Sequence, residues 1–155
     1  MKKNNSIFLS LLLNLFLSLF LNTAQAANIA TADSNIKITE AWVRAGVPGQ
    51  TVGAAYMTLT SAQNITLVSI ESVAAGSVEI HSMLMNNGVM KMRMLDKLDL
   101  SAGKAYKLAP NGFHLMLFDL KQPLIAGQKV DFTLHFKDKA NKVSQVKVTA
   151  PVKEQ

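Results

Sequence analysis

The sequence predicts an all-β domain with a sandwich or barrel architecture. Short segments rich in β-branched and aromatic residues alternate with turn signals such as Pro48-Gly49, Asn86-Asn87-Gly88 and Ala126-Gly127. The segment Val130–Phe136 alternates apolar and polar side chains, which is the two-residue period of a strand with one buried face. We find no long helical period and no internal repeat. Several short strands at this spacing are typical of β-sandwiches and barrels.

Residues 1–26 have the features of a secretory signal peptide. Lys2 and Lys3 precede an apolar run from Ile7 to Leu21, and Ala24-Gln25-Ala26 forms a small-x-small cleavage site. Cleavage after Ala26 leaves residues 27–155, a length that fits a single domain with its core at about 36–152. We therefore expect an exported protein that meets the membrane only through a transient signal. Lipid attachment at a new N-terminal cysteine is excluded, because the chain has no cysteine.

Nine strands are predicted between the turn signals. In chain order they are Ile36–Val43, Ala54–Thr60, Ile65–Ser72, Ser77–Met85, Val89–Leu95, Ala105–Leu108, Phe113–Leu120, Val130–Phe136 and Val143–Thr149. Ala27 to Asn35 reads as a polar lead-in, and a short helix or turn is possible near Ala45–Gly53.

Composition excludes several classes of protein. The zero cysteine count removes disulfides and thiolate chemistry. Without Lys2 and Lys3 the chain carries 14 basic and 10 acidic side chains, a net charge of +4. The basic residues are scattered, and the chain lacks the interleaved aromatic and basic residues of a nucleic-acid interface, so we expect no nucleic-acid binding. We also find no Ser-His-Asp set, no carboxylate pair in a cleft motif and no phosphate-binding glycine loop, and we expect no enzymatic activity.

Histidine and methionine gather in one part of the chain. Residues 81–116 contain six of the seven methionines after Met1 and two of the three histidines, His81 and His114. Four of these residues follow the spacing His81-x10-Met92-x21-His114-x-Met116. The third histidine, His135, falls on the polar face of its predicted strand and is interpreted as a surface or hydrogen-bonded residue.

Strand geometry can bring these side chains to one face. Residues at i and i+2 of a strand project together, so His114 and Met116 share a face while Phe113, Leu115 and Leu117 can enter the core. Asn87-Gly88 is a strong type I′ turn signal. A two-residue loop of Asn87-Gly88 pairs Met83 with Met92, whereas a loop of Asn86-Asn87 pairs His81 with Met92. Either register puts His81 and Met92 on one face, and a three-residue loop separates them.

Imidazole plus thioether is a ligand set that suits copper in the +1 state. Thioethers are neutral and soft, whereas zinc prefers thiolate, imidazole and carboxylate, and calcium and magnesium need oxygen. A blue-copper site requires a cysteine, which is absent. The alternative is that the methionines pack as core side chains, as single methionines on β-strands usually do. The full four-residue spacing favours a Cu(I) site formed by His81, Met92, His114 and Met116.

The chain resembles the periplasmic copper chaperone family PCu(A)C. The four-residue spacing matches the copper-ligand motif of that family without a gap. Further blocks are similar as well: Ala41-Trp42-Val43-Arg44, Ala55-Tyr56-Met57, Gly88-Val89-Met90-Lys91-Met92-Arg93 and Gly112-Phe113-His114-Leu115-Met116-Leu117, followed by Leu124 and Gly127. The similarity extends from about Ile36 to Val152.

The resemblance implies a cupredoxin-like Greek-key β-barrel and one Cu(I) per chain, held by His81, Met92, His114 and Met116. It implies delivery in the periplasm to the copper subunit of cytochrome c oxidase, at its Cu-A centre, or to another periplasmic copper chaperone, by a protein expected to be a monomer. Met83 and Met90 lie nearby but are not counted as ligands, and Trp42 and Arg44 are interpreted as packing and surface residues. Lys147 to Gln155 contains no His or Met, which argues against a second, Cu(II)-binding tail.

Two other functions remain open at this point. The protein could be a periplasmic copper buffer that holds the metal without a dedicated recipient. It could also be a metal-free exported β-sandwich whose methionines form an apolar contact surface for a protein or small ligand.

Overall fold

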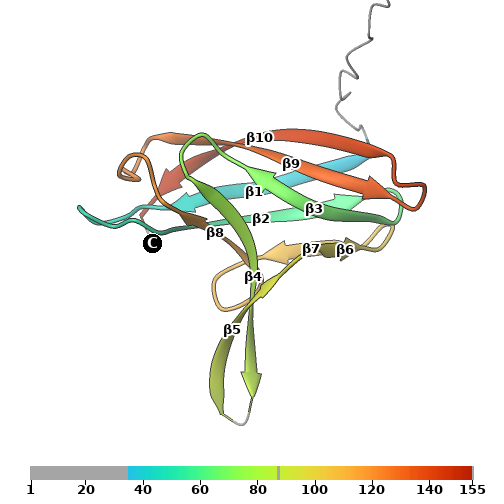
Figure 1. Ribbon diagram of the computed structural model, residues 1–155, viewed down its shortest axis with the longest axis horizontal. Helices are drawn as coiled ribbons and strands as arrows, with labels where there is room; N and C mark the ends of the chain where they lie inside the picture. Colours follow the sequence, from blue (N-terminus) through green and yellow to red (C-terminus); the bar gives the residue numbers. More distant parts are fainter. Residues whose placement is uncertain (1–34, 87, 155) are drawn as a thin grey trace, which may run out of the picture.

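A computed structural model describes residues 35–86 and 88–154 of the chain. These residues form ten strands (Figure 1): β1 (Ile36–Arg44), β2 (Gly53–Ser61), β3 (Ile65–Glu71), β4 (Ser77–Asn86), β5 (Val89–Leu95), β6 (Leu98–Leu100), β7 (Ala105–Leu108), β8 (His114–Phe118), β9 (Lys129–Asp138) and β10 (Val143–Lys153). The predicted signal peptide and most of the polar lead-in lie outside the described residues. Within the described part of the chain, no helix is long and apolar enough to cross a membrane.

Seven strands close into a barrel. Their order is β3-β4-β8-β2-β1-β10-β9, and β9 pairs with β3 to complete the ring. β1 and β10 run parallel, and the other pairs in the ring are antiparallel. The remaining strands extend the ring, β5 at β4, β6 at β3 and β7 at β2. The predicted all-β, cupredoxin-like Greek-key fold is therefore confirmed.

The barrel interior is filled by the apolar faces of the strands. On β9 the predicted alternation is confirmed, because Val130, Phe132, Leu134 and Phe136 are all buried. Leu115 and Leu117 of β8 enter the same core, as predicted. Burial of these side chains is the main source of stability for a domain that has no disulfide.

The β4–β5 hairpin projects away from the barrel (Figure 1). Asn86 pairs with Val89, Met83 with Met92 and His81 with Met94, which is the predicted register for a two-residue Asn87-Gly88 loop. Gly88 has a φ of 77°, as a type I′ turn requires. Beyond His81, the Met83 N–H of β4 donates one more backbone hydrogen bond, to the Gly112 carbonyl just before β8. Farther out, side chains such as Leu84, Met85 and Val89 are exposed.

Several predicted boundaries differ from the structure. β6 was not predicted, because three residues are too few to show a period of two. β10 continues to Lys153, where its last residues pair with β1. β8 begins at His114, and Phe113 is 37% exposed instead of buried, because it precedes the strand in the Pro110–Gly112 turn region. Ala45–Gly53 contains a turn at Pro48-Gly49 and no helix.

Candidate metal centre

The strand registers bring the four predicted ligands to one face of the sheet. His81 on β4 lies directly opposite His114 on β8. Met116 lies two residues beyond His114 and projects from the same face. Met92 on β5 is opposite Met83, two residues from His81, and is therefore a diagonal neighbour of His81. Three strands, of which two form a hairpin and one is more than twenty residues distant, thus present imidazoles and thioethers together.

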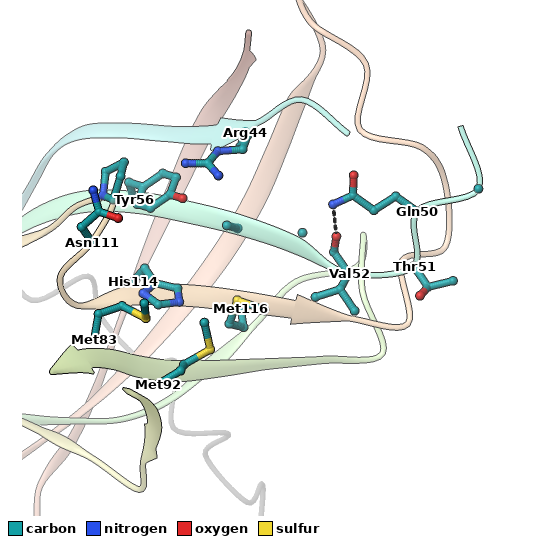
Figure 2. A pocket seen from close by; sticks show the side chains of 14 residues that line it. Arg44, Gln50, Thr51, Val52, Tyr56, Met83, Met92, Asn111, His114 and Met116 are labelled. Atoms are coloured by element: carbon teal, nitrogen blue, oxygen red, sulfur yellow. Dashed lines mark hydrogen bonds between the residues drawn. The ribbon is translucent and has the colours of Figure 1, made fainter. Parts of the chain in front are cut away.

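A cleft of about 560 Å³ opens beside this face. Figure 2 shows the thioethers of Met83, Met92 and Met116 gathered around the imidazole of His114. Arg44, Tyr56 and the loop before β2 complete the walls of this cleft. The lining residues of the cleft are Arg44, Gly49, Gln50, Thr51, Val52, Gly53, Ala54, Tyr56, Met83, Met92, Pro110, Asn111, His114 and Met116. His81 is not among them.

His114 presents one nitrogen for binding. The residue is buried, and its Nδ1 lies 3.0 Å from the carbonyl oxygen of Gly112. A carbonyl oxygen can only accept a hydrogen bond, so Nδ1 is the protonated nitrogen and donates. In the neutral ring the lone pair is then on Nε2. His114 is therefore prepared to bind a metal through Nε2.

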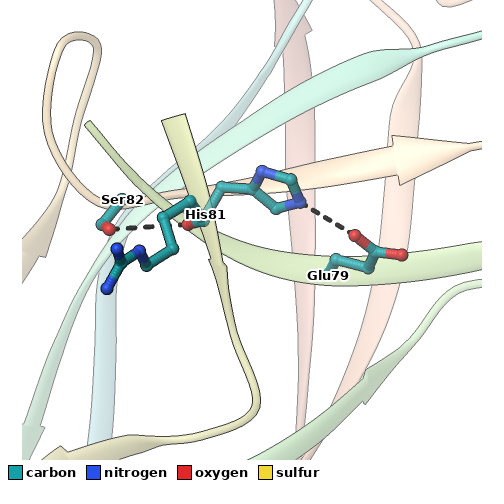
Figure 3. A network of polar contacts seen from close by, with 4 residues as sticks. Glu79, His81 and Ser82 are labelled. Atoms are coloured by element: carbon teal, nitrogen blue, oxygen red, sulfur yellow. Dashed lines mark hydrogen bonds and ion pairs between the residues drawn. The ribbon is translucent and has the colours of Figure 1, made fainter. Parts of the chain in front are cut away.

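His81 is held differently. Its Nε2 lies 2.8 Å from Oε2 of Glu79, the residue two positions earlier on β4 (Figure 3). Its Nδ1 is buried and has no hydrogen-bond partner among the described residues. The side chain is 11% exposed, so water reaches the ring only in part.

The two imidazoles are close enough to share one ion. Their ring centroids lie 5.9 Å apart. With a metal–nitrogen bond of about 2.0 Å, each ring centroid lies roughly 3 Å from the metal, so two rings up to about 6 Å apart can bind the same ion. The separation in the structure is within this limit.

Aromatic and cationic side chains form one wall of the cleft. The ring of Tyr56 packs against Trp42 at a centroid distance of 4.4 Å, and the Arg44 guanidinium lies 5.5 Å from the centre of the Tyr56 ring. Burial raises the pKa of the Tyr56 phenol, and the positive charge of Arg44 opposes this in part. Trp42 packs as predicted, whereas Arg44 also contributes to the cleft.

Sequence reasoning set aside one neighbour of the site and missed another. Met83 lines the cleft directly opposite Met92, although it was set aside as a ligand. Glu79 contacts His81, although no carboxylate was assigned to this region. The two-residue period of a strand could have identified both residues, since Glu79, His81 and Met83 are every second residue of β4 and therefore share a face. His135, by contrast, lies outside the cleft, with its Nε2 3.4 Å from Glu71 on β3 and without a hydrogen bond among the described residues.

The donor atoms in the cleft are soft. Among the described residues, no group of three or more His, Cys, Asp or Glu side chains could hold a metal ion. The cleft instead combines imidazole nitrogen with up to three thioether sulfurs. This donor set favours copper in the +1 state over zinc, calcium or magnesium.

Fold and cleft together define a cupredoxin-like domain that carries imidazole and thioether groups on one face. The sequence matches the family described as putative lipoprotein LpqE-like over residues 36–152, and the chain belongs to this family. It is 34% identical to the putative lipoprotein Lxx21020 of Leifsonia xyli over 94% of this chain and 86% of that protein. It is 32% identical to an uncharacterized protein of Rickettsia prowazekii, RP573, over 80% of this chain and 72% of that protein.

Solved structures extend the comparison. The chain is similar to the copper-bound PCuAC domain from PmoF2, with a TM-score of 0.63 and 26% identity, covering 78% of this chain and 94% of that domain. It is also similar to the solution structure of Cu(I)-loaded DR1885 from Deinococcus radiodurans, with a TM-score of 0.62 and 34% identity over 85% of this chain and 86% of that one. These similarities support the resemblance to the PCu(A)C family inferred from sequence.

Proposed function

We propose that this protein is a periplasmic copper chaperone. It binds one Cu(I) through His81, Met92, His114 and Met116, acts as a monomer without catalysing a reaction, and passes the ion to the Cu-A site of cytochrome c oxidase or to another periplasmic copper chaperone. The observation that carries the proposal is the grouping of three thioethers around His114 with His81 directly opposite. Similarity to domains whose structures contain copper supports the choice of metal.

Export to the periplasm is part of the proposal. The N-terminal 26 residues read as a cleavable signal, leaving residues 27–155 as one copper-binding domain. The family description as lipoprotein-like supports export. Thioether ligands are suited to an oxidising compartment, because a pair of thiols there would form a disulfide.

Release by ligand exchange follows from the chemistry of the donors. All four proposed ligands are neutral, so no bond between the ion and an anionic ligand has to break. Met92 is 52% exposed on the projecting hairpin, and its sulfur can be replaced first by a donor from the recipient. Solvent access at one side of the ion allows the recipient to approach while His114 still holds it.

Replacement of Met92 and Met116 by Ile tests the ligand assignment. We expect the M92I/M116I variant to lose Cu(I) binding while remaining folded, because isoleucine preserves apolar volume but removes both sulfurs. Binding is measured anaerobically by competition with a coloured Cu(I) chelator, and folding by circular dichroism. Met85, which is exposed at the hairpin tip outside the cleft, provides the matched control M85I, expected to bind normally. Unchanged affinity in M92I/M116I would refute the assignment.

Delivery is tested in a deletion strain. We expect loss of cytochrome c oxidase activity when copper is scarce, with recovery on addition of copper or of the wild-type protein. The M92I/M116I variant should not restore activity. Copper sensitivity with normal oxidase activity would instead identify the protein as a buffer.

A further inference from the structure

The contact between Glu79 and His81 determines which nitrogen of His81 is free. An ionised carboxylate only accepts hydrogen bonds, so Nε2 of His81 must donate to Oε2 of Glu79 across the 2.8 Å separation (Figure 3). In the neutral ring Nδ1 then carries the lone pair. Glu79 therefore selects the tautomer of His81.

The free nitrogen of His81 lacks a partner inside the protein. Nδ1 is buried without a hydrogen bond among the described residues. It is one of four buried side-chain atoms without a partner among the described residues, and a bound ion or a water can satisfy an atom of this kind. The His81 ring has two ring neighbours, the imidazole of His114 and the apolar ring of Phe118, at centroid distances of 5.9 and 6.0 Å.

We propose that Glu79 is a positioning residue for the copper cargo. It holds the ring of His81 so that copper binds Nδ1 of His81 and Nε2 of His114. This inference rests on the proposed function. Carboxylates that hydrogen-bond to the second nitrogen of a metal-binding histidine fix its tautomer and raise its basicity. At this site Glu79 has a further effect, because its negative charge compensates the single positive charge of an ion bound by four neutral ligands.

The chain provides a matched control for this contact. Glu71 on β3 lies 3.4 Å from Nε2 of His135 on β9, so it is also a carboxylate beside a histidine. Replacing Glu71 by Ala removes the same charge beside a histidine outside the cleft but breaks no hydrogen bond, so it controls for the loss of charge. Both glutamates are partly exposed, at 35% for Glu79 and 72% for Glu71, so neither substitution opens a cavity in the core.

The first test is the tautomer of His81 in the copper-free protein. Imidazole nitrogen-15 shifts are measured by NMR at about pH 8, where an ordinary imidazole is neutral. We expect a protonated Nε2 and an unprotonated Nδ1 in the wild type. E79Q keeps this pattern, because the amide oxygen of glutamine can accept the same hydrogen bond. E79A gives a mixture of tautomers. A wild type with Nδ1 protonated would overturn the inference.

The second test is Cu(I) binding by the same variants. We expect the Cu(I) affinity of E79A to fall about 10- to 100-fold, which is the usual cost of losing such a hydrogen-bond partner. E79Q should lose less, since it retains the hydrogen bond and loses only the charge, and E71A should match the wild type. On loading, the Nδ1 signal of His81 should shift while Nε2 stays protonated.

The outcomes separate this inference from the proposed function. A wild type that binds Cu(I) together with an E79A variant of equal affinity would overturn the role of Glu79 and leave the chaperone proposal intact. If Cu(I) loading shifted the nitrogen-15 signal of His81 Nε2 and not that of Nδ1, the role of Glu79 would also be overturned and the chaperone proposal would stand. A wild type that binds no Cu(I) would overturn both.

Discussion

Individual hydrogen bonds make the two imidazoles of the site unequal. The Gly112 carbonyl holds Nδ1 of His114, and the Glu79 carboxylate holds Nε2 of His81. One histidine is fixed by the backbone, which a side-chain substitution cannot remove, and the other by a side chain that is partly exposed to solvent. We infer that His114 is the more rigid donor and that the position of His81 depends on a second residue.

The residue types and spacing of the site could be predicted, but not its hydrogen bonds. The two-residue period and the Asn87-Gly88 turn were sufficient to place His81 with Met92 and His114 with Met116, whereas the pairing of β4 with β8 that joins them was not predicted. The contact of Glu79 with His81 depends on side-chain rotamers, which the pattern does not contain. The exposure of Phe113 was wrongly predicted for a similar reason, because the start of β8 depends on the preceding turn.

At the scale of elements, the projection of the β4–β5 hairpin explains why the methionines of β5 are exposed. Met90, Met92 and Met94 are 41%, 52% and 50% exposed, so they are not core residues, although such a triplet alone is usually a packing motif. β5 pairs only with β4, and its outer residues therefore have no second layer to pack against. The sequence left two hairpin registers open, and the structure has the one with the Asn87-Gly88 loop. The extent of the projection depends on where β8 stops pairing with β4.

The face occupied by Met92 can be tested without changing composition. In the variant K91M/M92K, lysine and methionine exchange places, and the thioether moves to the opposite face of β5. We expect this variant to lose Cu(I) affinity by more than roughly 100-fold, which exceeds the cost of losing only a supporting hydrogen bond. Both positions are exposed, so the fold should be unaffected. The measurement is chelator competition.

A second exchange controls for the new lysine. The variant M90K/K91M also places a lysine on the face of Met92, but it leaves Met92 in position. We expect its Cu(I) affinity to stay within about threefold of the wild type, since an exposed charge at this distance is screened by solvent and salt. Equal losses in both exchange variants would show that the added charge, and not the thioether, determines binding.

For the whole molecule, the core and the cleft are largely separate. The ring of seven strands is closed by backbone pairing, and its interior is filled by side chains such as Val43, Leu59 and Phe132. The three methionines of the cleft are not among the buried core residues. Among the described residues, the methionine that packs in the core is Met57. A barrel of this kind is therefore complete without a bound ion. The proposed carrier function requires this property, because a carrier must remain folded after it releases the ion.

Copper loading and removal should therefore change stability without changing the fold. A ligand that binds only the native state stabilises it by about 2.7 kcal/mol when its free concentration is 100 times its dissociation constant. We expect Cu(I) at that excess to raise the free energy of unfolding by about this amount, and a Cu(I) chelator to return it to the copper-free value with unchanged circular dichroism. The measurement is urea denaturation under anaerobic conditions, with M92I/M116I as a control that shows no gain. Unfolding on removal of copper would mean that the metal is a structural component and not cargo, because a carrier must survive the loss of its ion.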